Sequence, residues 1–451
     1  MKQTKRIKST TQVIMLGFLA VILLGSIVLS LPVCSSGDKI SYLDALFTAT
    51  TSVCVTGLVT LPTVSTWSTF GQIVILILIQ IGGLGVITVF SGFMISARKK
   101  FGIGYRMLIQ DSFNLNSLHG LRGFVKKVII ASFAIEAAGA LSYMTVFVPR
   151  FGARGIWVSL FTSVSAFCNA GIDIIAENSL CDYALSPVIN LTTILLIVLG
   201  GIGYIVWLDL SMADAGVFKN GKSAFRNLTV HTKTALAATA VLIFGGALLF
   251  MIFEYNNPLT IGKFGLFDKI QFSFFQSVTT RTAGFATVPQ ENLTNASSFV
   301  SMVLMFIGGS PVGTAGGIKT VTVAVIFASV LSAVKQKDEV SIFGRAIPPQ
   351  VVKKAIAVAV TSFSIAFIST ALLSAVTGGN ALDTAYESVS ACATVGLSKN
   401  YTATLNAAGK AIIIATMYLG RVGPISLAVA FNQKRENQLK IKNPTGEFIV
   451  G

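Results

Sequence analysis

Apolar residues run through this chain in long stretches that short polar connections separate. Eight stretches hold about 20 residues or more, the length that crosses a bilayer as a helix. They lie at residues 13–31, 70–97, 124–148, 187–212, 234–253, 299–334, 351–376 and 410–431. The pattern predicts an all-α membrane protein with eight transmembrane helices.

The first apolar stretch follows Lys2, Lys5, Arg6 and Lys8, as it would in a secretory signal peptide. It is long for such a peptide, and Pro-Val-Cys at 32–34 is a poor cleavage site. We therefore favour a helix that is retained.

Four shorter apolar segments lie between successive pairs of these stretches, and a glycine follows each one. Residues 44–52, 158–166, 268–277 and 383–391 each predict two to three turns of helix. The glycines that follow, Gly57, Gly171, Gly284 and Gly396, recur at steps of 114, 113 and 112 residues. A fixed period indicates one structural unit used four times. We expect units at 1–105, 106–218, 219–340 and 341–451, in a pseudo-fourfold arrangement around a central pore.

The direction of the short helices suggests their chemistry. A helix that enters the membrane from outside turns its C-terminal end, equivalent to about half a negative charge, toward the membrane centre. Asp44, Asp268 and Asp383 lie near the outer ends of three of the four, where acids favour the N-terminal dipole. Backbone at this depth is tolerated where protein buries it or where it lines a wet cavity, and four loops facing one another meet that condition.

The residues after each short helix are expected to return outward with their carbonyl oxygens facing the axis. Glycine permits backbone angles that a side chain resists, and rings of carbonyls can replace the hydration shell of a monovalent cation. We call these four tripeptides the glycine loops. They are Val55-Thr56-Gly57, Asn169-Ala170-Gly171, Thr282-Ala283-Gly284 and Thr394-Val395-Gly396. They predict a potassium-binding selectivity filter.

The second long stretch of the third unit is interrupted at residues 308–317, where six of ten residues are glycine or proline and a helix is costly. One interpretation is a kink with small-residue packing. We favour a loop that obstructs the pathway below the filter, because 36 residues are too many for one straight span. The candidate gate residues are Gly308, Gly309, Ser310, Pro311, Gly313, Thr314, Gly316, Gly317, Lys319 and Arg421.

Two of these gate candidates are cations at membrane depth, where charge is costly and faces a cavity or a partner. Arg421 is expected either to form an electrostatic barrier or to bond a carbonyl of the loop, with an ion pair to Glu136 as the alternative. For Lys319 the alternative is snorkelling to the interface. We expect Arg281 to brace the third glycine loop through an acid such as Glu387.

Charge sets the expected orientation. The net charge is +16, and most of the 34 lysines and arginines lie at the two termini and in the even-numbered connections. Positive charge is retained on the cytoplasmic side, so both termini are expected there. This distribution points to a multi-pass membrane protein with anionic lipid as a partner, and not to nucleic acid. The sequence has no nucleophile–base set, phosphate loop or metal-type cysteine spacing, so we expect neither an enzyme nor a nucleotide bound by this chain.

Four further motifs accompany the glycine loops: IQIGGLG at 79–85, LGGIG at 199–203, SVTTRTAGF at 277–285 and GRVGP at 420–424. Together they resemble the membrane subunit of the bacterial Trk/Ktr/HKT potassium-uptake superfamily, and within it the KtrB branch. The resemblance covers essentially the whole chain. It implies four diverged copies of a two-helix potassium channel in the bacterial plasma membrane.

The resemblance also implies a substrate, a gate and partners. Glycine in all four loops implies a preference for potassium, since sodium-selective relatives carry serine where Gly57 stands here. The loop at 308–317 and Arg421 correspond to the family's gate. A homodimer above a cytosolic ring of nucleotide-binding subunits of the KtrA type is implied as well. Sodium dependence is left open.

Other classes of function fit less well. A carrier that couples sodium to potassium by alternating access is the alternative within transport, but such carriers show inverted halves, whereas these four copies run in the same direction. A membrane-embedded enzyme needs a catalytic constellation, and a scaffold does not need four glycine loops.

Overall fold

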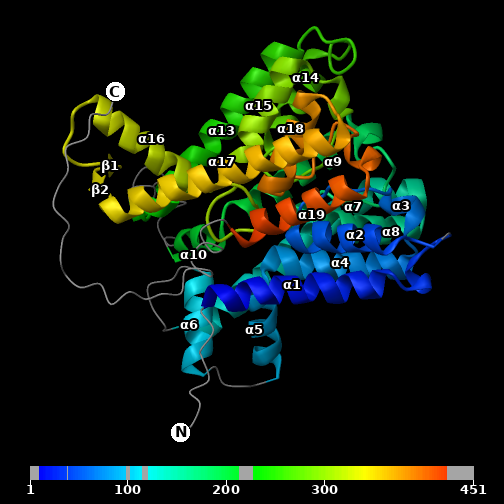
Figure 1. Ribbon diagram of the computed structural model, residues 1–451, viewed down its shortest axis with the longest axis horizontal. Coiled ribbons are helices and arrows are strands. Elements are labelled where there is room, and N and C mark those ends of the chain that lie inside the picture. The colour runs from blue at the N-terminus through cyan, green and yellow to red at the C-terminus, as the bar shows by residue number, and fades with distance from the viewer. Residues whose placement is uncertain (1–9, 38, 98–101, 114–119, 213–226, 424–451) are drawn as a thin grey trace.

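The structure is a computed structural model, which describes residues 10–37, 39–97, 102–113, 120–212 and 227–423. These residues are mostly helical, and many of the helices run roughly parallel across the view in Figure 1. The strands among them form one short antiparallel hairpin of β1 (Ser341–Ile342) and β2 (Arg345–Ala346). The predicted all-helical class is confirmed.

Four consecutive segments share one order: a long helix, a short helix, a glycine loop and a second helix. The first holds α1 (Thr10–Leu29), α2 (Tyr42–Cys54) and α4 (Thr69–Leu84). The second holds α7 (Leu121–Phe151), α8 (Arg154–Phe167) and α9 (Pro187–Gly201). The third holds α13 (Val230–Glu254), α14 (Leu266–Thr279) and α15 (Asn295–Phe306), followed by α16 (Thr320–Val334). The fourth holds α17 (Pro349–Thr377), α18 (Ala381–Ala393) and α19 (Ala407–Val422). The remaining elements are η1 (Pro32–Cys34), α3 (Thr63–Thr66), α5 (Val86–Ser96), α6 (Ile103–Ser112), η2 (Cys181–Tyr183), α10 (Tyr204–Met212), η3 (Gln290–Asn292) and η4 (Thr402–Thr404).

Three described helices, α1, α13 and α17, are long and apolar enough to cross a membrane, and the number rises to five if each of two bent pairs is one span. The bent pairs are α4 with α5, at 99°, and α9 with α10, at 89°. The spans predicted at 70–97 and 187–212 are therefore each broken by a sharp bend. The bends fall at Gly85 and Gly203, whose φ angles of 86° and 96° take the chain out of the helical region. The last predicted span, 410–431, extends beyond the described residues, and α19 ends at Val422.

Three of the four short helices begin with a capping side chain or an acid that the sequence carries. The side chain of Ser41 caps α2 by accepting from the Asp44 N–H, and Asn380 caps α18 in the same way. Asp44, Asp268 and Asp383 each lie in a first turn, where a carboxylate favours the positive end of the helix dipole. As expected, α8 has no acid there. The short helices are 13 or 14 residues long, somewhat longer than predicted.

The second helices link neighbouring segments, and α4, α9 and α19 also pack against the short helix of their own segment. Each second helix contacts the short helix of the next segment, and α19 of the fourth segment contacts α2 of the first. Glycines allow the close approach within a segment: a Cβ on Gly82, Gly200 or Gly420 would lie 2.1, 2.0 or 2.1 Å from the carbonyl oxygen of Val53, Phe167 or Cys392. The third segment departs from this pattern, because a Cβ on Gly308 would instead meet Gly316 O at 2.0 Å. The helix break predicted at 308–317 is present, between α15 and α16.

Candidate functional site

The four glycine loops share one backbone conformation. Their first residues all have a positive φ, although none is glycine: 55° at Val55, 57° at Asn169, 71° at Thr282 and 52° at Thr394. The glycines follow with φ of 95° at Gly57, 64° at Gly171, 85° at Gly284 and 97° at Gly396, and the residue between has a negative φ. A positive φ is uncommon outside glycine, so its recurrence at four equivalent positions marks the loops as copies of one structure.

The loops meet one another through their glycines. A Cβ built on each glycine would collide with the carbonyl oxygen of the next loop: Gly57 with Ala170 O at 2.5 Å, Gly171 with Ala283 O at 2.5 Å, Gly284 with Val395 O at 2.5 Å, and Gly396 with Thr56 O at 2.2 Å. The last of these contacts returns from the fourth loop to the first. The four glycines also line one cavity of about 240 Å³. The predicted loop residues are thus brought together from all four segments.

Hydroxyl groups on the short helices hold two of the loops from behind. The Gly57 N–H donates to Thr51 Oγ1 at 2.9 Å, and the Gly396 N–H donates to Ser390 Oγ at 3.0 Å. In each case the hydroxyl lies six residues before the glycine. These bonds fix the glycine amides of the first and fourth loops to their short helices. Sequence reasoning missed these supports, and the recurrence of Ser or Thr at that offset, including Ser165, was the available signal.

Carboxylates line the cavity beside the four glycines. Asp173 lies two residues after Gly171, and burial raises its pKa to about 6, against hydrogen bonds that favour the ionised form. Glu177 accepts from the Ser65 hydroxyl at 3.0 Å, and Glu291 accepts from the side-chain amide of Asn400 at 3.0 Å. An ionised carboxylate here attracts cations.

The 308–317 loop packs on the end of α9. The Ser310 and Thr314 amides donate to Gly201 O at 2.8 Å and Gly200 O at 3.1 Å, and the Tyr204 amide donates to Val312 O at 2.9 Å. These bonds satisfy backbone groups that a helix would have paired internally. The loop is therefore an ordered, hydrogen-bonded structure.

Gly316 is the point at which the loop touches the glycine loops. Its N–H donates to Thr282 Oγ1 at 3.1 Å. A Cβ at this position would lie 1.9 Å from Thr394 Oγ1 and 2.5 Å from Ala393 O. The glycine thus sits between the third and fourth glycine loops with no room for a side chain.

Arg421 ties the loop to two other parts of the structure. Its Nη1 donates to Thr314 O at 2.7 Å and its Nη2 to Gly82 O at 2.6 Å. The expected bond to a loop carbonyl is present. The alternative, an ion pair with Glu136, is not, because Glu136 accepts from Gln80 at 3.0 Å. Arg421 lies in the last turn of α19 and not in the middle of a helix.

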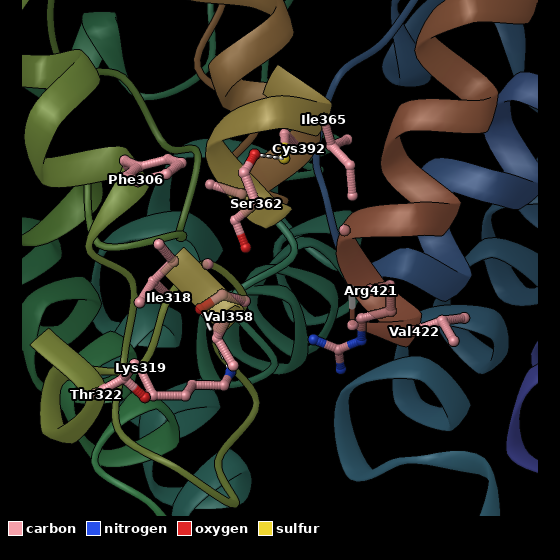
Figure 2. Close-up of a pocket in the computed structure, with 15 residues that line it drawn as sticks. Phe306, Ile318, Lys319, Thr322, Val358, Ser362, Ile365, Cys392, Arg421 and Val422 are labelled. Atoms are coloured by element: carbon pink, nitrogen blue, oxygen red, sulfur yellow. Dashed lines mark hydrogen bonds between the residues drawn. The ribbon is translucent and has the colours of Figure 1, made fainter. Parts of the chain in front are cut away.

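Lys319 lies beside the same loop and donates to Ala315 O at 2.6 Å. Lys319 and Arg421 both line a cavity of about 290 Å³, and Figure 2 shows their side chains extending toward the space between them. The described residues that line this cavity include no acid. Among the residues that the structure describes, the acceptors for these two side chains are backbone carbonyls.

The expectation for Arg281 was wrong. Its Nη2 lies near Thr239 Oγ1 at 3.4 Å and Gly308 O at 3.5 Å. Glu387 accepts instead from Ser398 and Thr402. Arg281 thus contacts the start of the 308–317 loop.

Comparison with known proteins identifies the family. The model of the TrkH family, described as "Cation transport protein", matches residues 1–440. The chain belongs to the TrkH family. It is therefore a transport protein and not an enzyme.

Several curated relatives of this TrkH-family chain span nearly its whole length. Ktr system potassium uptake protein B of Bacillus subtilis is 38% identical, with 98% of this chain and 96% of the relative covered. Potassium/sodium uptake protein NtpJ of Enterococcus hirae is 36% identical, over 100% and 99%. Among solved structures, the potassium transporter TrkH from Vibrio parahaemolyticus matches with a TM-score of 0.77, covering 96% of this chain and 86% of that one at 16% identity. That likeness confirms a TrkH-like fold.

Proposed function

We propose that this TrkH-family chain takes up potassium ions across the bacterial plasma membrane, through a filter of backbone carbonyls supplied by the four glycine loops. In this proposal eight membrane-crossing segments, some bent or broken, surround a central pathway with pseudo-fourfold symmetry. The names of the relatives support potassium as the substrate, and the name of the Enterococcus relative adds sodium.

One observation carries the proposal: each loop glycine lies against the carbonyl of the next loop, and the fourth lies against the first. A closed ring of carbonyls, in which the Gly57 and Gly396 amides are bonded to the short helices, can replace a hydration shell. The C-terminal ends of four short helices add negative potential without an ionised side chain.

The 308–317 loop is the gate in this proposal, and it closes the pathway in the described state. Gly316 lies against Thr282 and Thr394. Arg421 binds the loop through Thr314 O, and Lys319 binds it through Ala315 O. Two cations with no carboxylate partner among the described residues also oppose the passage of another cation.

Control from the cytoplasm is the third part of the proposal. It comprises both termini in the cytoplasm, a homodimer, and a cytosolic nucleotide-binding ring that moves the gate. The arm formed by α16, the β hairpin and α17 extends from the body in Figure 1 and carries exposed Lys335, Lys337, Lys353 and Lys354. This basic surface suits an acidic subunit or anionic lipid.

Flux into liposomes that contain the purified chain tests the filter. The wild type is expected to admit potassium in preference to sodium. Gly57→Ser should reduce that preference, because a Cβ at 57 would lie 2.5 Å from Ala170 O. Saturable exchange with fixed sodium-to-potassium coupling, unaffected by this substitution, would instead establish the alternating-access carrier.

A further inference from the structure

A buried carboxylate stands behind the fourth glycine loop. Glu387, on α18, is 0% exposed, and neither ion pair among the described residues includes it. Its two oxygens accept from hydroxyls: Oε1 from Ser398 Oγ, and Oε2 from Thr402 Oγ1 at 2.8 Å. A buried charge is costly, and hydrogen bonds to an ionised acceptor are among the strongest in proteins.

Glu387 and Ser390, both on α18, form hydrogen bonds to the fourth glycine loop or to the residues just after it. Ser390 accepts from the Val395 amide through its carbonyl, at 2.8 Å, and from the Gly396 amide through its hydroxyl, at 3.0 Å. Glu387 lies three residues earlier, on the same face of the helix. It binds Ser398, two residues beyond Gly396. The helix therefore holds the loop at three successive points, of which Ser398 is the outermost.

The other three units carry no carboxylate at this position of the short helix. The residues that correspond to Glu387 in the repeated segments are Thr48, Thr162 and Gln276, and the buried Gln276 donates to Gln290 at 2.7 Å. The Thr162 hydroxyl is buried without a hydrogen-bond partner. A carboxylate at this position is thus a property of the fourth unit alone.

We infer that Glu387 is a positioning residue for ion selectivity, which fixes the outer end of the fourth glycine loop through Ser398. The inference rests on the proposed function, since it presumes that the loops select ions. A carbonyl ring favours one ion over another only while its oxygens keep their spacing and number. Loss of the outermost anchor lets the fourth loop move, and a smaller cation then competes.

The test compares Glu387→Gln with Glu254→Gln in liposome flux. Glutamine keeps the shape and one acceptor but removes the charge. Glu254 is the matched control, since it is also 0% exposed and also accepts from hydroxyls, those of Thr260 and Thr294. Thr260 lies in the connection between α13 and α14, and Thr294 is the N-cap of α15. We expect the ratio of potassium to sodium flux to fall about tenfold for Glu387→Gln, the scale of one charge-assisted hydrogen bond, and to stay unchanged for Glu254→Gln.

Ser398→Ala tests the link itself and serves if Glu387→Gln does not fold. It should lower the flux ratio as much as Glu387→Gln, and the double variant should add little more. Equal ratios in the wild type, Glu387→Gln and Ser398→Ala would overturn the inference, as would an equal fall in Glu254→Gln. If potassium selectivity is lost in Gly57→Ser but kept in Glu387→Gln, the inference about Glu387 is wrong and the proposed filter is not affected. A wild type without potassium preference defeats the proposed function, and this inference with it.

Discussion

Replacing Gly316 with alanine should open the gate. The residue has a negative φ, so the backbone itself accepts alanine. The obstacle is contact: the new Cβ would lie 1.9 Å from Thr394 Oγ1 and 2.5 Å from Ala393 O. The hydroxyl can rotate, but the carbonyl belongs to the end of α18 and cannot move without it. The 308–317 loop must therefore shift away.

The magnitude follows from two costs to the closed state. Overpacking of this kind costs about 1–3 kcal/mol. Loss of the hydrogen bond from the Gly316 amide to Thr282 adds about 1 kcal/mol. A total of about 3 kcal/mol changes the ratio of closed to open molecules about 100-fold. Where the closed state dominates, flux should rise by a comparable factor.

The assay is potassium flux into liposomes containing the chain without any cytosolic partner. Gly245→Ala is the control, since nothing lies within 4 Å of its added Cβ and it sits within α13. There alanine should stabilise the helix by about 0.5–1 kcal/mol and leave flux unchanged. Flux for Gly316→Ala that matches the wild type, from protein with an unchanged melting temperature, would refute the assignment of this loop as the barrier. A rise accompanied by loss of potassium preference would show that the glycine loops moved instead.

Three further predictions follow from other contacts. Arg421→Gln removes two charge-assisted hydrogen bonds to carbonyls, of 2.7 and 2.6 Å, and should raise partner-free flux about tenfold or more; lower flux would contradict a role in holding the gate closed. Asp173, with a pKa of about 6, is charged at pH 7 and neutral at pH 5. The potassium concentration for half-maximal flux should therefore rise about threefold when the pH falls from 7 to 5, because the neutral carboxyl no longer attracts potassium. Asp173→Asn should abolish this pH dependence. Lys410→Met removes the partner of Asp44 in a 2.5 Å ion pair whose two side chains are both largely buried. Because this leaves a buried charge unpaired, the melting temperature should fall as for a loss of about 3 kcal/mol in stability. Adding Asp44→Asn should restore part of that loss.

The sequence predicted the features that depend on period and composition. The glycine period located the four loops, and the composition of 308–317 located the break between α15 and α16. Hydropathy did not predict the bends at Gly85 and Gly203, because apolar residues continue through both and the property that matters is a positive φ. The sequence also did not predict the partner of Arg281, because the order of residues along the chain does not show which groups lie nearest to it in the fold.

Comparison of the four repeated units shows that Arg421 stands where the other units carry glycine. Gly82, Gly200, Gly308 and Gly420 head corresponding motifs, so Arg421 occupies the place of Gly83, Gly201 and Gly309. An added Cβ on Gly309 would lie 2.4 Å from the Ala315 Cβ, and one on Gly201 would lie 3.3 Å from Asn169 Nδ2 and 3.5 Å from the Ala315 Cβ.

Glycine at those two positions leaves the space into which the 308–317 loop folds. In the fourth unit the same position carries a long cation, which reaches the adjacent Thr314 O. Arginine in the fourth copy of the motif thus makes the hydrogen bond that holds the loop, whereas glycine in the second and third copies avoids a clash with it. On this reasoning an arginine at Gly201 would displace the loop, and only the copy at 421 can hold it in place.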